Sequence, residues 1–221
     1  YPGQSYTRTL SMTNAGGSAL EFSGSESNVV TPSAVTLPTD GEDFESGVPP
    51  NGWQTQDVPG QGVSWKTNEA YGADNTAGSG LAAHVSSGAN RSTPYDARLV
   101  TPEKTFGENT TLSFDLSFQK YVLGNENFDV GISTDGGSSW TRLRRFEDDA
   151  GAENGTSVVI GNDALAQHVS VGESFQIRFR YWSPQEAPWD YYAQVDNVSF
   201  SPPTQFFTFG PTEGTVQPDS T

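Results

Sequence analysis

Three segments of the chain alternate between apolar and polar residues with the two-residue period of a β-strand. Residues 111 to 118 place four apolar side chains on one face, and residues 128 to 132 and 175 to 181 repeat the pattern. Further candidate strands are residues 63 to 66, 81 to 85, 98 to 101, 140 to 146, 157 to 160 and 193 to 200. Only residues 163 to 167 could hold a helical turn. The apolar faces predict the core of an all-β sandwich.

Composition supports an all-β fold and limits the function. The chain has 221 residues with 24 Gly, 14 Pro and 12% aromatic residues, and it shows no long amphipathic helical pattern. No stretch approaches the roughly 18 apolar residues of a membrane span. The formal charge of -16 opposes binding to nucleic acid and to anionic lipid, and the lack of cysteine excludes disulfides and thiol catalysis. We therefore expect no nucleic-acid partner and no membrane insertion.

The two ends of the chain differ from its middle, and we divide it into residues 1–37, 38–202 and 203–221. The first end contains a strand pattern at Tyr6 to Thr13, an Asn-Ala-Gly-Gly turn at residues 14–17 and a second strand through Leu20 and Phe22. The last end contains a strand pattern at Gln205 to Phe209. Neither end can bury a core alone.

Both ends resemble parts of bacterial immunoglobulin-like repeats, one the opening hairpin and the other the closing portion. Two explanations follow. The middle module is inserted into one immunoglobulin-like domain, or each end completes a sheet in a neighbouring domain or subunit by strand addition.

Acidic residues stand near both ends of the middle segment. Asp43 and Glu45 flank Phe44, and Asp196 lies in a strand pattern about 150 residues later. First and last strands of a sandwich often lie side by side, and carboxylates brought together there need a cation. Calcium at this seam is one interpretation. Ordinary solvated turn acids are the other, and residue spacing alone favours them.

Residues 133 to 140 read Ser-Thr-Asp-Gly-Gly-Ser-Ser-Trp, which fits the Asp-box pattern of a tight hairpin. Asp135 should bond backbone amides, the glycines supply positive φ, and Trp140 should be buried beneath the turn. We interpret this motif as structural, because the pattern performs no chemistry of its own.

Catalytic motifs are weak in this sequence. His84 and His168 are the only histidines, and neither belongs to a hydrolase elbow or a zinc-binding helix. Residues 183 to 192 bring aromatic side chains into a proline-bearing loop, and Trp182 directly precedes it. Trp182, Trp189 and Tyr191 could stack against a sugar or contact a protein, or they could be buried and hold the loop.

The middle of the chain resembles the cleaved-adhesin modules of gingipain-type proteins and, more distantly, MAM domains. The segments that carry this resemblance, in order, are Asp43 to Glu45, Pro50 to Trp53, Ser64-Trp65, Gly78 to Leu81, Asp96 to Pro102, Leu112 to Phe114, Val130 to Trp140 and Gln194 to Val198. It covers about residues 38 to 202.

The resemblance implies a jelly-roll sandwich stabilised by calcium and without enzymatic activity. By position it implies that the metal ligands are Asp43, Glu45, Ser79, Asp96 and Asp196. Gly78 departs from the family, because some members carry Asn there, and water could replace that ligand.

These observations lead to two hypotheses about function. The first is a non-enzymatic binding or adhesion module, stabilised by calcium, which acts outside a bacterial cell or on its surface and binds an extracellular protein or glycan. The second is a structural subunit of an extracellular fibre or tube, which joins neighbouring copies of itself by strand addition through its ends.

Overall fold

The computed structural model describes residues 20–23, 41–58, 60–70, 72–89, 94–121, 124–184, 191–201 and 213–216. The chain divides into two compact units. One comprises residues 37–203, and the other comprises residues 1–36 together with residues 204–221. In the described residues, no helix is long and apolar enough to span a membrane.

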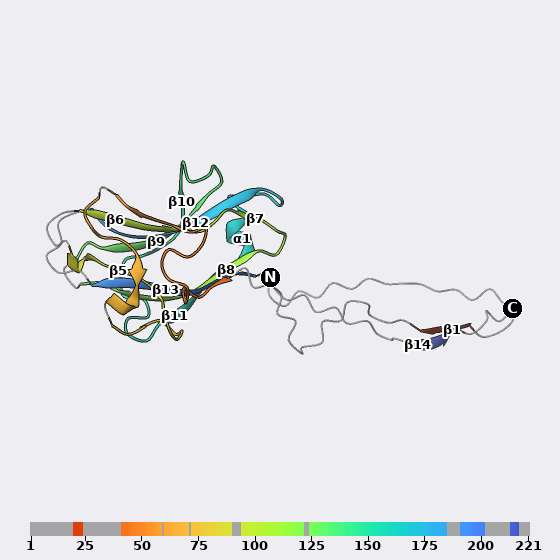
Figure 1. Cartoon of the computed structure of the whole chain (residues 1–221). Helices are drawn as coiled ribbons and strands as arrows, with labels where there is room; N and C mark the ends of the chain where they lie inside the picture. Colours follow the sequence, from red (N-terminus) through yellow and green to blue (C-terminus); the bar gives the residue numbers. More distant parts are fainter. Residues whose placement is uncertain are drawn as a thin grey trace. The chain divides into compact units, whose positions relative to one another are not determined.

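The larger unit is a sandwich of two antiparallel sheets (Figure 1). Sheet I has the strand order β10-β9-β12-β6-β3, with β7 paired to β12. Its strands are β3 (Gln54–Asp57), β6 (Tyr95–Val100), β7 (Lys104–Thr105), β9 (Asn127–Ser133), β10 (Thr141–Phe146) and β12 (Ser174–Ser183). β12 is an interior strand of this sheet, between β9 and β6.

Sheet II has the strand order β11-β8-β13-β5-β4, with β2 paired to β13. Its strands are β2 (Gly41–Glu42), β4 (Lys66–Thr67), β5 (Ala83–Ser86), β8 (Thr111–Gln119), β11 (Thr156–Ile160) and β13 (Tyr192–Ser201). The predicted all-β, jelly-roll class is confirmed. Because β2 and β13 are neighbours, the first and last strands of this unit do lie side by side.

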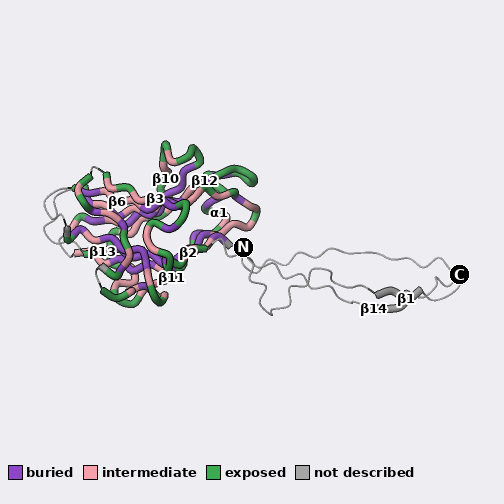
Figure 2. Tube along the Cα trace, viewed as in Figure 1, coloured by how far each residue is buried: buried purple, intermediate pink, exposed green. Residues whose placement is uncertain are grey.

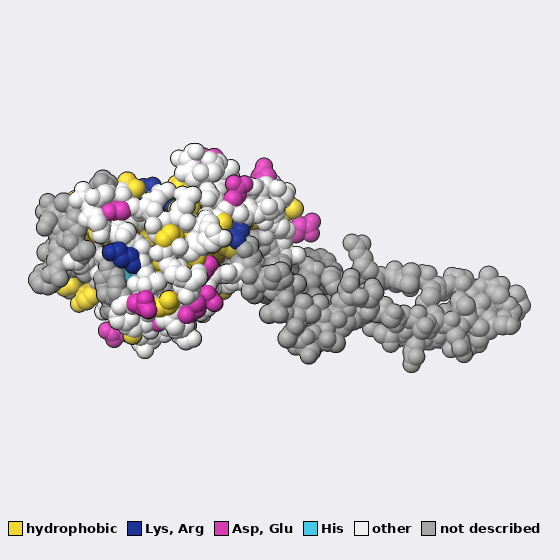
Figure 3. Space-filling model, viewed as in Figure 1, with side chains coloured by type: hydrophobic (Ala, Val, Ile, Leu, Met, Phe, Trp, Pro, Cys, Tyr) yellow, Lys and Arg dark blue, Asp and Glu magenta, His cyan; other side chains and the backbone are white. Residues whose placement is uncertain are grey.

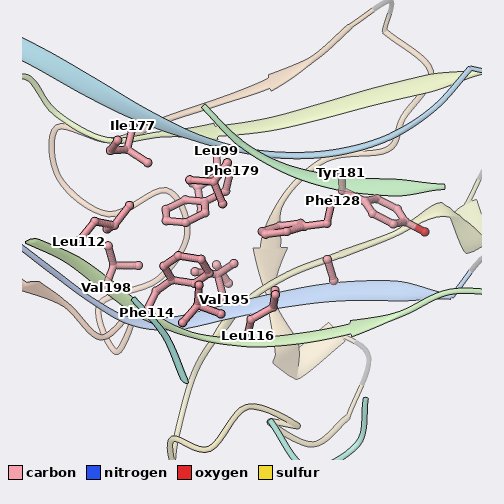
Figure 4. Close-up of a cluster of buried hydrophobic side chains, with 14 of the residues drawn as sticks. Leu99, Leu112, Phe114, Leu116, Phe128, Ile177, Phe179, Tyr181, Val195 and Val198 are labelled. Carbon is pink, nitrogen blue, oxygen red and sulfur yellow. The ribbon is translucent and has the colours of Figure 1, made fainter. Parts of the chain in front are cut away.

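The core lies between the two sheets, where buried residues follow the strands of both layers (Figure 2). Along β12, every second residue from Phe175 to Tyr181 is buried, and the residues between them are partly exposed. Ile177 and Phe179 of sheet I point toward Phe114 of sheet II (Figure 4). The predicted apolar faces therefore form the core, and the polar faces form the outer surfaces.

Short helices complete the larger unit. They are η1 (Asn68–Ala70), η2 (Ser87–Ala89) and α1 (Asn162–Leu165). The expected helical turn near residues 163 to 167 is confirmed by α1, which buries Leu165 against the core. The strand expected from Val63 is wrong in its extent, because only Lys66 and Thr67 pair. Val63 and Trp65 are nevertheless buried, so apolar character there reflects packing without sheet pairing.

The smaller unit contains a two-stranded antiparallel sheet of β1 (Leu20–Ser23) and β14 (Glu213–Val216). Leu20 pairs with Val216, so one end of the chain provides a strand partner for the other. The strands expected at Tyr6 to Thr13 and at Gln205 to Phe209 lie outside the described residues.

Candidate functional site

The backbone around β2 and β13 is distorted in a way that exposes acidic side chains. Phe44, the second residue after β2, has a φ of 57° and is fully buried, and it therefore fixes Asp43 and Glu45 at the surface on either side of it. In β13 the register shifts between Asp196 and Ser199, and Asn197 has a φ of 50°. Such a bulge redirects side chains at a strand. Two irregular segments thus meet where β2 pairs with β13.

A hollow of about 530 Å³ lies at this place. It is lined by Asp43, Glu45, Ala77, Gly78, Ser79, Gly80 and Asn197. Both positions favour glycine. Gly80 has a φ of 97°, and methyl groups on Gly80 and Gly78 would lie against Glu45 Oε1 and Asp196 Oδ2. Glu45 Oε1 instead accepts a hydrogen bond of 2.7 Å from the Leu81 amide.

Asp196 is the most unusual acid at the site. Its side chain is only 1% exposed, and burial raises its pKa to about 7, with the carboxylates of Asp74, Asp115 and Asp43 adding to the effect. The Asn197 amide donates a hydrogen bond of 2.7 Å to Asp196 Oδ1, which opposes the rise without cancelling it. The ionised form of Asp196 is therefore under-compensated by the protein groups around it.

Asp74 adds to this negative charge. Its Oδ1 accepts hydrogen bonds from the amide and hydroxyl of Thr76. Its Oδ2 is buried and has no hydrogen-bond partner among the described residues. An unpaired buried carboxylate oxygen is costly unless a positive charge is near.

The oxygen groups at the hollow suit a hard cation. Calcium takes 6–8 oxygen ligands from carboxylates, amide and backbone carbonyls and water. Two carboxylates, a hydroxyl, the Asn197 amide and a glycine-rich backbone line the hollow. Across the described residues, no group of three or more His, Asp or Glu side chains is arranged to hold a metal. A cation here would therefore depend on backbone, amide and water oxygens as well as on carboxylates.

The structure brings together most of the expected ligands, but not Asp96. Asp43, Glu45 and Ser79 line the hollow, and Asp196 lies directly behind Gly78. Asp96 lies on β6 of sheet I, where its two oxygens accept hydrogen bonds from Arg98 and Arg180. The placement expected for Asp96 is thus wrong, because strand pairing gives this carboxylate two arginine partners.

The expected ligand-binding aromatics lie in different surroundings. Trp182 lies on β12, donates a hydrogen bond of 2.9 Å to Asp129 Oδ2, and contacts two guanidinium groups. Tyr191 is 43% exposed and lies 6.0 Å from the Tyr121 ring. Trp189 lies outside the described residues.

The Asp-box motif forms the expected hairpin turn. Asp135 accepts hydrogen bonds from Ser133 Oγ and from the amide and hydroxyl of Ser139, and these bonds lower its pKa to about 2. The Trp140 indole donates a hydrogen bond of 3.0 Å to Gly137 O. The expected burial of Trp140 is wrong, because its ring lies on the outer face of sheet I and is only partly covered.

The sequence interpretation missed Asp74 and Asn197 as parts of the site. The local pattern Asp74-Asn75-Thr76 is typical of a turn in which an acid bonds the residue two positions on, so a loop with a fixed carboxylate could have been expected. Nothing in the sequence around Asn197 shows that its backbone would turn into the left-handed region.

Together, the two sheets and the acidic hollow define a jelly-roll sandwich module. The family model of the Cleaved Adhesin Domain matches residues 36–157, and the chain belongs to this family. The family is one of adhesins, and the chain is an adhesion-type binding module that acts outside the cell or at its surface.

Two curated relatives come from Porphyromonas gingivalis. Hemagglutinin A and Lys-gingipain W83 are each 36% identical to this chain over 99 residues, or 43% of its length. The matched region covers only 4% of the first relative and 6% of the second.

Solved structures show the same fold. The K1 cleaved adhesin domain of Lys-gingipain from P. gingivalis W83 has a TM-score of 0.54 and 21% identity, and the match covers 74% of this chain and 97% of that domain. The K3 domain has a TM-score of 0.53 and 23% identity, with 73% and 97% covered.

Proposed function

We propose that the chain is a non-enzymatic adhesion module that binds an extracellular protein or glycan, and that a calcium ion at the acidic hollow stabilises its fold. The observation that carries the calcium proposal is the buried, under-compensated Asp196 behind a hollow walled by Asp43, Glu45 and two glycines. A divalent cation would offset the repulsion among these carboxylates.

Four side chains would hold this ion, those of Asp43, Glu45, Ser79 and Asn197. Backbone oxygens of residues 78–80, the glycine-rich loop, would add further ligands. The bound ion would supply positive charge and a fixed link between this loop and the end of β2. Asp196 would act through its negative charge beneath the loop.

A structural role for the buried histidine supports the non-enzymatic part of the proposal. His84 is 4% exposed, its ring stacks on Tyr192 at 5.5 Å, and its Nδ1 lies 3.0 Å from Gln194 Nε2. Burial lowers its pKa to about 4, so the ring is neutral at ordinary pH. These features are typical of a histidine that holds strands together.

Gly78→Ala should weaken calcium binding at least tenfold, because its methyl group would lie 2.0 Å from Asp196 Oδ2 and 2.8 Å from Asn197 Nδ2. A calcium titration by calorimetry measures this directly. Gly161→Ala is the matched control, since a methyl group there meets nothing within 4 Å. Equal calcium affinity in the two variants would remove the hollow from the calcium proposal.

The alternative function is that of a structural subunit. The pairing of β1 with β14 favours it in one respect, because a two-stranded sheet is marginally stable alone and its outer edges can accept strands from a neighbouring copy. Under this alternative, the purified chain assembles into fibres or tubes.

Removing residues 1–36 and 204–221 separates the two functions. We expect the full chain to be monomeric in sedimentation and to bind extracellular-matrix protein or glycan. The shortened chain should keep a folded, calcium-stabilised sandwich, because the core formed by the described residues lies within residues 37–203. Fibres that form from the full chain and disappear on removal of its ends would establish the structural subunit instead.

A further inference from the structure

Arginines gather on the outer face of sheet I. Arg178 and Arg180 alternate along β12 with Ile177 and Phe179, which point into the core (Figure 4). Arg98 on β6 pairs with Arg180 across the sheet, while Arg145 is on β10. We call these four side chains the arginine face. The chain has only 11 Lys and Arg against 27 Asp and Glu, and Asp and Glu are more widespread than Lys and Arg on the face in view in Figure 3. The arginine face is therefore a local exception in an acidic protein.

Three carboxylates, those of Asp96, Asp129 and Glu147, only partly neutralise the arginine face, and Glu147 lies 3.8 Å from Arg145. Asp96 pairs with Arg98 and Arg180 at 2.6 and 2.8 Å, and Asp129 pairs with Arg145 at 2.7 Å. Within the described residues, Arg178 has no ion pair, and its buried Nε has no hydrogen-bond partner.

The pKa of Arg178 reflects the excess of positive charge around its guanidinium group. Its pKa is lowered to about 10, first by burial and then by the charges of Arg180 and Arg98. The carboxylates of Asp96 and Asp129 act in the opposite direction but do not cancel the effect. Positive charge thus remains uncompensated around this guanidinium.

Aromatic rings hold the guanidinium groups in place. Arg178 lies 4.6 Å from the centre of the Trp140 ring, and Trp182 has Arg180 at 4.5 Å and Arg145 at 5.0 Å. Planar cations held in this way lose little freedom when they bind a planar anion.

We propose that the arginine face is a binding site for a carboxylate-bearing polysaccharide, with Arg178 as the main contact to the carboxylate. This inference rests on the proposed function as a binding module. Trp140 and Trp182 hold the arginines in position, and their rings are occupied by guanidinium groups.

The position of the site favours a polysaccharide over a peptide. Extended peptides commonly bind by adding a strand to an open sheet edge. Three of the four arginines lie on the interior strands β12 and β6, and only Arg145 lies on the edge strand β10. Arg178 and Arg180 are two residues apart on one strand and so about 7 Å apart along it. A repeat of cations across a sheet face matches a polymer that presents carboxylates at intervals along a stiff chain.

Binding of the full, calcium-supplemented chain to immobilised hyaluronan tests this proposal, with neutral dextran as the comparison. Hyaluronan should bind at low salt and be released by high salt, while dextran should not bind. Arg178→Gln should weaken hyaluronan binding at least tenfold, because a charge-assisted contact is lost. Lys66→Gln removes the same charge from an exposed position on β4 of sheet II and should leave binding unchanged.

Thermal melting of each variant shows whether it is folded. If Arg178→Gln does not fold, Arg178→Lys, which keeps the charge and loses the planar fork, should give a smaller loss of affinity. No hyaluronan binding at low salt, or equal binding by the folded Arg178→Gln variant, overturns the proposal. Equally tight binding to poly-L-glutamate, lost in the same variant, would assign the face to an acidic protein instead. Binding to a neutral glycan or matrix protein that Arg178→Gln leaves intact would keep the adhesion function and reject this site.

Discussion

Chelating calcium should lower the free energy of unfolding of this chain by about 2.7 kcal/mol, compared with protein in free calcium at a hundred times its Kd. The reason is mass action, since the ion binds oxygen groups that only the folded chain brings together at Asp43, Glu45 and the glycine-rich loop. Denaturant unfolding in calcium and in EDTA measures the difference. Magnesium at the same concentration is a useful comparison, because it requires stricter octahedral geometry.

Wild type and the Asp196→Asn variant should differ in stability in opposite directions in calcium and in EDTA. In calcium the wild type should be more stable, because the variant lacks the negative charge beneath the ion. In EDTA at pH 8 the variant should be more stable, because burial raises the pKa of Asp196 to about 7 and its ionised form is costly there. The stability associated with protonated Asp196 is present below its ordinary pKa of 3.8 and is lost as the pH rises to about 7.

In EDTA, the contribution of Asp196 to the free energy of unfolding should change by on the order of a few kcal/mol between pH 4 and pH 8. His84 contributes in the opposite direction. Its pKa is lowered to about 4, so the stability of its neutral form is lost as the pH falls from 6.5 toward 4. Subtracting the profile of Asp196→Asn from that of the wild type removes this common contribution. Identical profiles in EDTA, together with no response to calcium, would reject the role of Asp196.

The sequence predicted the core well because the core depends on local alternation. Along β12 the apolar residues recur at every second position, and any sandwich must turn that face inward. Leu165 illustrates the same point for α1, whose short helical turn was expected and is observed. Val63 and Trp65 show the limit of the pattern, since both are buried without belonging to a strand.

The candidate site was harder to predict because it depends on contacts between distant segments. Asp43, Glu45 and Ser79 meet at one hollow, as the family resemblance implied by position. The same positional argument placed Asp96 at the hollow, but Asp96 lies on β6 of sheet I. There its carboxylate accepts a hydrogen bond from Arg180, 84 residues later in the chain. The pairing of β6 with β12 decides this outcome, and no local pattern encodes it.

The bulge in β13 is a second feature that the sequence does not show. Asn197 has a left-handed φ and lies in the part of β13 where the pairing with β8 shifts, between Asp196 and Ser199. This turn places Asn197 at the hollow while Asp196 stays buried. Asn is one of the few non-glycine residues that adopts this conformation readily, so its presence permits the bulge without predicting it.

Phe179→Ala should destabilise the larger unit by about 3–5 kcal/mol through the cavity that it leaves in the core. Phe179 is fully buried, and its ring lies 5.0 Å from Phe114 of sheet II and 6.3 Å from Phe128 of its own sheet, so it joins the two layers at their centre. Val159→Ala is the control, because Val159 is 60% exposed and should cost less than about 0.5 kcal/mol. Denaturant unfolding with calcium present measures both. A loss below about 1 kcal/mol for Phe179→Ala would mean that the two sheets do not share the close-packed core on which the position of the calcium site and of the arginine face depends.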